Sequence, residues 1–139
     1  MDVARLLGRS AALLILLALF TGFFVAAAMT GKVPADSHAA LASHLNALLG
    51  SFWILGVAWS LPLLRYGEKG LTRLAWLTIA PNYANWIVTA LKALWRVAGV
   101  DFVGEGRNDT IFGLLSILVV IPSIAAASAW LYGFGAAKK

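Results

Sequence analysis

The sequence predicts an all-α integral membrane protein: a four-transmembrane-helix bundle that forms a single membrane domain over residues 1–139. The composition is 61% hydrophobic and only 12% charged, with a mean hydropathy of +0.85, which lies far outside the range of soluble domains. The charges cluster between apolar runs of about 18 or more residues, each long enough to cross a hydrocarbon core as a helix. The absence of cysteine excludes disulfides and thiolate metal sites.

The first predicted span, about 11–30, contains no ionisable residue and is expected to be a scaffold helix. It is longer than a usual signal-peptide core, so we interpret it as a retained membrane helix despite the small residues at 26–28. The second span, about 39–63, follows Asp36 and Ser37, a plausible helix cap. Its first turns carry Ser43, His44 and Asn46.

The third and fourth spans are predicted at about 71–96 and 110–134. Pro81 lies in the middle of the third and removes a backbone donor, which predicts a local kink. Pro122 predicts a similar irregularity in the fourth, and Asp109 with Thr110 is expected to cap it. The loop at 97–109 is either a lid or only a connection.

The distribution of basic residues predicts that both termini are cytoplasmic. With that orientation the inner segments hold seven basic and two acidic residues, whereas the outer segments hold four of each. The basic sequence pI, near 10, therefore reflects membrane topology, with lipid as a partner and no nucleic acid. His44 and Asn85 then share the outer half of the membrane.

The stretch Pro-Asn-Tyr-Ala-Asn-Trp at 81–86 places polar groups inside the third span. Such groups in a membrane helix normally face other helices, a ligand or water. One helical face is shared by Thr78, Asn82, Asn85, Thr89, Lys92 and Arg96. On these grounds the asparagines either hydrogen-bond neighbouring helices or bind a ligand.

The polar side chains within the spans restrict the possible chemistry. No span contains Asp or Glu, which argues against a Ser-His-Asp hydrolase and against a proton-coupled multidrug transporter. His38 and His44 are six residues apart and cannot chelate one metal together on a helix. A lone histidine is more often a hydrogen-bonded or interfacial residue, but imidazole is also a common axial ligand of haem iron. The polar side chains within the spans are therefore suited to bind a cofactor or a neutral substrate.

Two segments resemble a known family. Ser-His-Leu-Asn-Ala-Leu-Leu-Gly-Ser-Phe at 43–52 and Tyr-Ala-Asn-Trp at 83–86, with Thr89, are similar to the corresponding helices of hydroxylaminobenzene mutase. The same helices and Asn-Asp-Thr-Ile-Phe at 108–112 resemble styrene oxide isomerase more distantly. Three positions depart from the family pattern, namely Gly50-Ser51 in place of Asn-Gly, Pro81 in place of an aspartate, and Thr89 in place of a tyrosine.

The resemblance implies a homotrimer in the bacterial inner (cytoplasmic) membrane, with ferric haem b between subunits. By position, His44 would be the metal ligand and Asn85 would orient the oxygen of a small aromatic substrate. Asn82 and Tyr83 are further catalytic candidates. The remaining cofactor-binding candidates are Asn46, Ser51 and Trp86.

The activity that the resemblance implies is a redox-neutral rearrangement with ferric iron as Lewis acid. The substrate is either an arylhydroxylamine, giving an aminophenol, or an aryl epoxide, giving an aldehyde by Meinwald rearrangement. The mutase-like Tyr-Ala-Asn-Trp favours the hydroxylamine. The alternatives are a non-catalytic membrane haem or scaffold protein and a transporter of small molecules.

Overall fold

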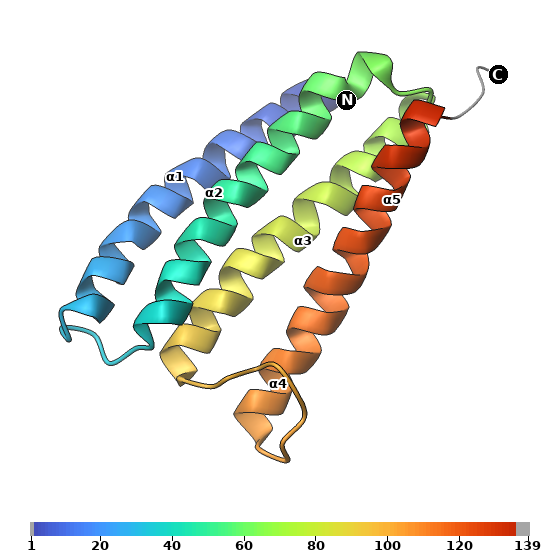
Figure 1. Cartoon of the computed structure of the whole chain (residues 1–139). Coiled ribbons are helices and arrows are strands. Elements are labelled where there is room, and N and C mark those ends of the chain that lie inside the picture. Colours follow the sequence, from blue (N-terminus) through green and yellow to red (C-terminus); the bar gives the residue numbers. More distant parts are fainter. Residues whose placement is uncertain (1, 136–139) are drawn as a thin grey trace.

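The protein is all-helical in a computed structural model that describes residues 2–135. The elements in chain order are α1 (Val3–Met29), α2 (Ser37–Ser60), the 3-10 turn η1 (Leu61–Leu63), α3 (Glu68–Trp95), α4 (Gly106–Leu114), the π-helical η2 (Leu115–Val120) and α5 (Ile121–Gly135). The last three follow one another without a break. The start of α1 and the end of α5 lie at the same end of the molecule (Figure 1), as an even number of passes requires.

Three helical segments are long and apolar enough to cross a membrane: Val3–Met29, Ser37–Leu63 and Gly106–Gly135. This is the pattern of a multi-pass membrane protein. The helix α3 is long enough, at 28 residues, but it is not apolar enough to qualify by composition. The polar stretch at 81–86 lowers its hydropathy, so the prediction of four spans is confirmed by composition for three of them.

The helix boundaries differ from the prediction where capping residues decide them. The first helix begins well before residue 11, because Asp2 caps it by accepting from the backbone N of Arg5 at 3.2 Å. Asp36 is confirmed as the cap of α2, with its Oδ1 accepting from Ala39 N at 2.6 Å. The predicted Asp109-Thr110 cap is wrong, since Glu105 caps α4.

The two prolines within the long helices have different surroundings. The helix α3 continues through Pro81, whose side chain is fully buried. The irregularity predicted at Pro122 is confirmed as the π-helix η2, which ends directly before α5. Proline lacks the N–H that would bond one turn back, and the wider π turns accommodate the freed carbonyl groups.

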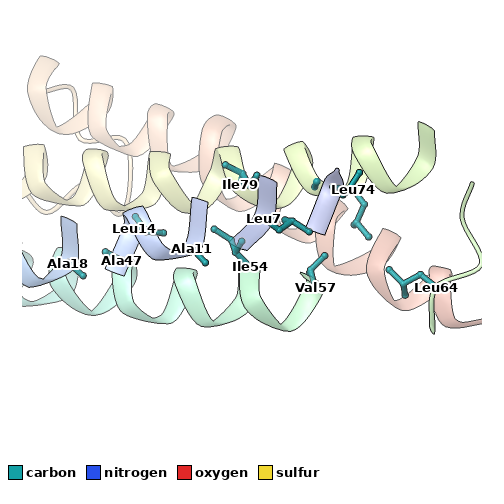
Figure 2. Packing of buried hydrophobic residues seen from close by; sticks show 12 residues of the cluster. Leu7, Ala11, Leu14, Ala18, Ala47, Ile54, Val57, Leu64, Leu74 and Ile79 are labelled. Carbon is teal, nitrogen blue, oxygen red and sulfur yellow. The ribbon is translucent and has the colours of Figure 1, made fainter. Parts of the chain in front are cut away.

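The core lies where α1, α2 and α3 meet. Small and branched residues at helical spacing on α1 form its centre: Leu7, Ala11, Leu14 and Ala18 are fully buried. They pack against residues of α2 and α3, among them Ala47, Ile54, Val57, Leu74 and Ile79 (Figure 2). Without a hydrophobic force between helices in lipid, close packing of small residues holds such helices together.

The last helix, α5, lies at the edge of the molecule beside α3 (Figure 1). The C-terminal half of α5 is hydrogen-bonded to the end of α2 and to the turn between α2 and α3. The Tyr66 hydroxyl donates to the Ala129 carbonyl at 2.7 Å, and Arg65 N donates to the Gly133 carbonyl at 2.9 Å. Trp130 Nε1 donates to Ser60 Oγ at 2.8 Å. The order across the molecule is therefore α1, α2, α3, α5, with α1 and α5 at opposite edges.

Candidate functional site

Three polar side chains meet between α2 and α3. Asn46 Nδ2 donates to Asn85 Oδ1 and to Thr89 Oγ1, both at 3.1 Å, and Thr89 Oγ1 donates to Asn85 Oδ1 at 3.2 Å. We call Asn46, Asn85 and Thr89 the amide cluster. The two asparagines are half-buried and Thr89 is buried. The structure thus brings the predicted Asn46 and Asn85 together.

One group of the amide cluster, the side-chain N–H group of Asn85, is still able to donate a hydrogen bond. The Asn85 carbonyl oxygen accepts two hydrogen bonds, whereas its Nδ2 donates none to any residue in the range 2–135. The structure leaves no buried polar side-chain atom of a described residue without a partner, so this amide group reaches the protomer surface. A fixed amide with an open N–H is suited to hold an oxygen atom of a ligand.

His44 lies at the contact between α2 and α1. Its Nδ1 is 2.7 Å from the Ala18 carbonyl oxygen. A carbonyl oxygen can only accept, so Nδ1 carries the proton, and in the neutral ring Nε2 keeps its lone pair. Within residues 2–135, Nε2 makes no hydrogen bond. A histidine whose second nitrogen donates to a backbone carbonyl is held in the orientation and tautomer of a metal ligand.

The side chain of Asn82 contacts other residues than those of the amide cluster. Its Nδ2 donates to the Thr78 carbonyl at 2.8 Å, one turn back in α3. Its side chain also lies against Gly50 of α2, where an added Cβ would be only 2.6 Å from Asn82 Oδ1. Asn82 is 6% exposed and sits in the close approach of two helices. The structure therefore gives it a packing role.

Three other predicted site residues use their polar atoms elsewhere in the protomer. The Tyr83 hydroxyl donates to the Ser10 carbonyl of α1 at 2.8 Å. Trp86 Nε1 donates to Thr21 Oγ1 at 2.9 Å, also on α1. Ser51 is fully buried and donates to the Leu48 carbonyl of its own helix at 2.6 Å. The structure does not bring these three side chains to the amide cluster.

His44 and the amide cluster lie on different sides of α2. Residues two positions apart in an α-helix are separated by about 200° around its axis. His44 accordingly faces α1, whereas Asn46 faces α3. One protomer therefore does not place the imidazole and the Asn85 amide in a single pocket.

A cavity of about 600 Å³, lined by both charged and apolar residues, lies where α2 begins and α3 ends. Ala42, which lies one turn before Asn46, lines it, as does Lys92, which follows Thr89 by one turn. Its charged and titratable lining residues are Asp36, His38, Lys92 and Arg96. The cavity therefore lies about one helical turn from the cluster, and no residue of the cluster lines it.

Several contacts of the site are not apparent from the sequence. The carbonyl of Ala18 orients His44, and Gly22, one turn further along α1, lies beside the imidazole, where an added Cβ would be 3.7 Å from His44 Cε1. Ser43 Oγ donates to the Trp86 carbonyl at 3.0 Å and ties α2 to α3 beside the site. The only signal in the sequence was the pair of small residues at 18 and 22, which permits close helix approach.

Comparison with known proteins shows the family of the chain. A family model described as styrene oxide isomerase matches residues 3–135. The hydroxylaminobenzene mutase HabB of Ectopseudomonas oleovorans is 26% identical over 137 residues, which cover 92% of this chain and 80% of the relative. No solved structure matches. Because the family match runs from the first turn of α1 to the end of α5, the chain belongs to the styrene oxide isomerase family, a family of isomerases that act on small substrates.

Proposed function

We propose that this protein is a membrane-bound, haem b-dependent intramolecular isomerase of small aromatic compounds. The observation that carries the proposal is the hydrogen bond from His44 Nδ1 to the Ala18 carbonyl, which leaves Nε2 free to bind iron. Within residues 2–135 no group of three or more His, Asp or Glu could hold a metal ion by side chains alone. A haem needs only one such side chain, because the porphyrin provides four nitrogen ligands.

The residues of the chain fit such a group by their chemistry. His44 is half-buried at the edge of the α1–α2 contact, so Nε2 is accessible from outside the protomer. The neighbouring Leu45, Leu49 and Phe52 are exposed apolar residues on α2, 44%, 64% and 59% exposed. Together they form a surface on which a flat apolar ring system can lie.

When bound, ferric haem supplies a Lewis acid that polarises the N–O bond of an arylhydroxylamine or the C–O bond of an epoxide. The protein then has to hold the substrate oxygen and keep water away. Asn85 Nδ2 is the donor for that oxygen, and Asn46 with Thr89 fixes the orientation of the Asn85 amide. The surrounding membrane helices exclude water that would trap a cationic intermediate.

A second protomer completes the site in this proposal. His44 and the amide cluster lie on different sides of α2, so imidazole and amide can face one substrate only across a contact between chains. The homotrimer implied by the family resemblance provides such contacts. The half-buried polar cluster is also expensive to leave against lipid, which favours a neighbour that covers it.

The proposal includes α3 as the fourth membrane span, with both termini in the cytoplasm of a bacterial cell. The place of α3 between α2 and α5 supports this (Figure 1). Its polar residues Asn82 and Asn85 are hydrogen-bonded within the protomer, which lowers the cost of their transfer into lipid. The excess of basic residues on the side of the termini gives the orientation.

Between the two substrate classes, we favour arylhydroxylamine. The similarity to the hydroxylaminobenzene mutase HabB covers 92% of this chain. The resemblance of Tyr-Ala-Asn-Trp at 83–86 to the mutase points the same way. Conversion of an aryl epoxide to an aldehyde remains the second candidate, because the matching family model is that of styrene oxide isomerase.

Ultraviolet-visible spectra of the detergent-purified protein test the cofactor. Wild type should show a haem Soret band that His44→Ala loses while its far-ultraviolet circular dichroism stays helical. His38→Ala is the matched control, because His38 is exposed at the start of α2, and it should keep the band. A folded wild type without a Soret band after expression with ample haem would overturn the proposal. Product analysis with phenylhydroxylamine and styrene oxide then separates the two substrate classes.

A further inference from the structure

Two adjoining pockets lie at the end of the molecule where α3 begins. The larger, about 520 Å³, is a groove between α3 and the η2–α5 segment. The smaller, about 420 Å³, lies on the first turns of α3. They share Thr72 and Arg73, so the two form one continuous surface. The groove is lined by Thr72, Arg73, Trp76, Leu77, Ala80, Pro81, Ala84, Leu118 and Pro122.

The groove is apolar and opens to the side of the molecule. Ala80, Pro81 and Ala84 on α3 and Pro122 on α5 are too small to fill the space between the helices. Trp76 and Leu118 line it and are 52% and 45% exposed, so its open side faces outward. In a membrane, that side borders the acyl chains. The groove can therefore take up a long, flexible apolar chain.

The smaller pocket is polar and carries two cations, Lys69 and Arg73, against one carboxylate, Glu68. Thr72 Oγ1 donates to the Glu68 carbonyl at 3.0 Å. Neither Lys69 nor Arg73 forms an ion pair with any residue that the structure describes. Both are exposed at the end of a long helix, where a membrane protein meets the headgroup layer.

We propose that the two pockets together bind one anionic phospholipid. Its phosphate contacts Lys69 and Arg73, and one acyl chain lies in the groove between α3 and α5. Guanidinium and ammonium groups are the usual protein partners of phosphate. An apolar groove that ends in a cationic pocket matches the two parts of a phospholipid, whereas a second copy of this chain would have to present an anion at the same place. The inference is independent of haem and of the isomerase reaction.

The lipid would also act on the fold. It fills space between α3 and the η2–α5 segment, where only small side chains stand, and so joins the edge helix to the core. Delipidated protein should accordingly unfold at a lower temperature than protein supplied with the lipid.

Native mass spectrometry of the delipidated full chain tests the headgroup contact. Phosphatidylglycerol should bind at least tenfold more tightly than phosphatidylcholine with the same acyl chains. The double variant Lys69→Gln/Arg73→Gln should lose this preference. Arg9→Gln is the matched control, because Arg9 is an exposed cation near the same end of the molecule but lines neither pocket. Equal losses in both variants would mean general surface attraction and would overturn the site.

Fluorescence tests the chain contact, first in the wild type and then in single variants. Phosphatidylglycerol with brominated acyl chains should quench tryptophan emission, and the share of the quenching that is due to Trp76 should be missing from Trp76→Phe. Ala80→Phe should fill the groove and weaken the binding of phosphatidylglycerol at least fivefold, with the protein still monodisperse on size exclusion. Quenching of the same extent in Trp76→Phe and in the wild type would place the chain elsewhere. Disulfide cross-linking between Ala80→Cys copies would assign the groove to a second protomer instead.

Discussion

At the scale of single residues, Asn85 is the side chain whose loss should separate catalysis from structure. Asn85→Ala removes the proposed donor to the substrate oxygen, and loss of such a donor lowers turnover by about 10²–10³-fold. Haem content should stay at the wild-type level, because His44 lies on the other side of α2. Turnover per haem, with the Soret absorbance as the measure of occupied sites, checks this expectation.

Two further variants identify which part of the amide cluster matters. Asn85→Asp keeps the acceptor for Asn46 and Thr89 but has no N–H to donate, so it should be nearly as inactive as Asn85→Ala. Thr89→Val keeps the shape and removes two hydrogen bonds, the one accepted from Asn46 and the one donated to Asn85. Asn46 still donates to Asn85 Oδ1 and the Asn85 N–H is kept, so Thr89→Val should reduce turnover far less. Wild-type turnover in Asn85→Asp would show that the Nδ2 group is not used.

Gly50 is a second residue at which the structure predicts the effect of a substitution, here on stability. Its missing side chain allows α2 to approach Asn82 of α3, because an added Cβ would lie 2.6 Å from Oδ1 and 3.1 Å from Cβ of that residue. Gly50→Ala should therefore destabilise the protein by about 1–3 kcal/mol. Thermal unfolding in detergent measures this, with Gly8→Ala as the control, since nothing lies within 4 Å of a Cβ there. A Gly50→Ala variant as stable as Gly8→Ala would show that the helices separate easily.

At the scale of elements, the connection between α3 and α4 is an ordered structure held by the first turn of α4. Asn108 is 5% exposed, accepts from Gly99 N at 2.7 Å and donates to the Asp101 carbonyl at 2.7 Å. Asp109 accepts from Val103 N at 2.9 Å and from Gly104 N at 3.1 Å. The residue that sequence reasoning took for a helix cap thus organises the loop that precedes the helix.

Asn108→Ala should release this loop while the long helices stay intact. The change leaves the buried backbone N–H of Gly99 without its partner, at a cost of about 1–3 kcal/mol. Hydrogen exchange followed by mass spectrometry should become faster at residues 99–104 and stay unchanged in α2. Thr110→Ala is the control, because its hydroxyl is exposed and bonds only within α4. Equal exchange in Asn108→Ala and wild type would mean that other contacts hold the loop.

At the scale of the whole molecule, the separation of His44 from the amide cluster predicts complementation between inactive chains. If the protein forms the proposed trimer, co-expressed His44→Ala and Asn85→Ala should assemble into mixed trimers in which some contacts pair an intact His44 with an intact Asn85. With random assembly and one partner from each chain, roughly a quarter of the sites are complete. Activity should therefore return to roughly a quarter of wild type, whereas each variant alone stays inactive.

The control for complementation is the double variant His44→Ala/Asn85→Ala co-expressed with wild type. Random pairing again completes roughly a quarter of the sites if the two residues come from different chains, but half if they come from the same chain. No recovery of activity from the two single variants, with mixed trimers shown by differently tagged chains, would mean that both residues act within one protomer.

The sequence predicted the helices better than it predicted their ends and their partners. Apolar runs fix where the helices lie, and Asp36 was recognisable as a cap because it stands alone before a helix. Glu105 was missed because Asp109 lies one turn away and satisfies the same rule. The form of the irregularity near Pro122, a π-helix, depends on how the carbonyl groups before it find partners, which the sequence does not specify.

For the site, periodicity correctly placed Asn85 and Thr89 on one face of α3, and the amide cluster confirms that face. It could not show that Asn46 is the partner, because a helical face does not identify the neighbouring helix. Tyr83 is adjacent in sequence to Asn82 but lies about 100° around the helix, which turns its hydroxyl to α1. Ser51 stays a cofactor-binding candidate, and its polarity alone could not show that its hydroxyl bonds within its own helix.

The fastening of α5 to the turn between α2 and α3 bears on the order of biosynthesis. Ribosomes make the chain from its N-terminus, so Tyr66 and Arg65 are synthesised before their hydrogen-bond partners. The partner of Tyr66 is Ala129, and the partner of the Arg65 backbone is Gly133. The first three helices are therefore complete before the partners of this turn exist. A ribosome stalled before residue 129 would leave a chain in which none of these contacts between α5 and the rest of the molecule can form.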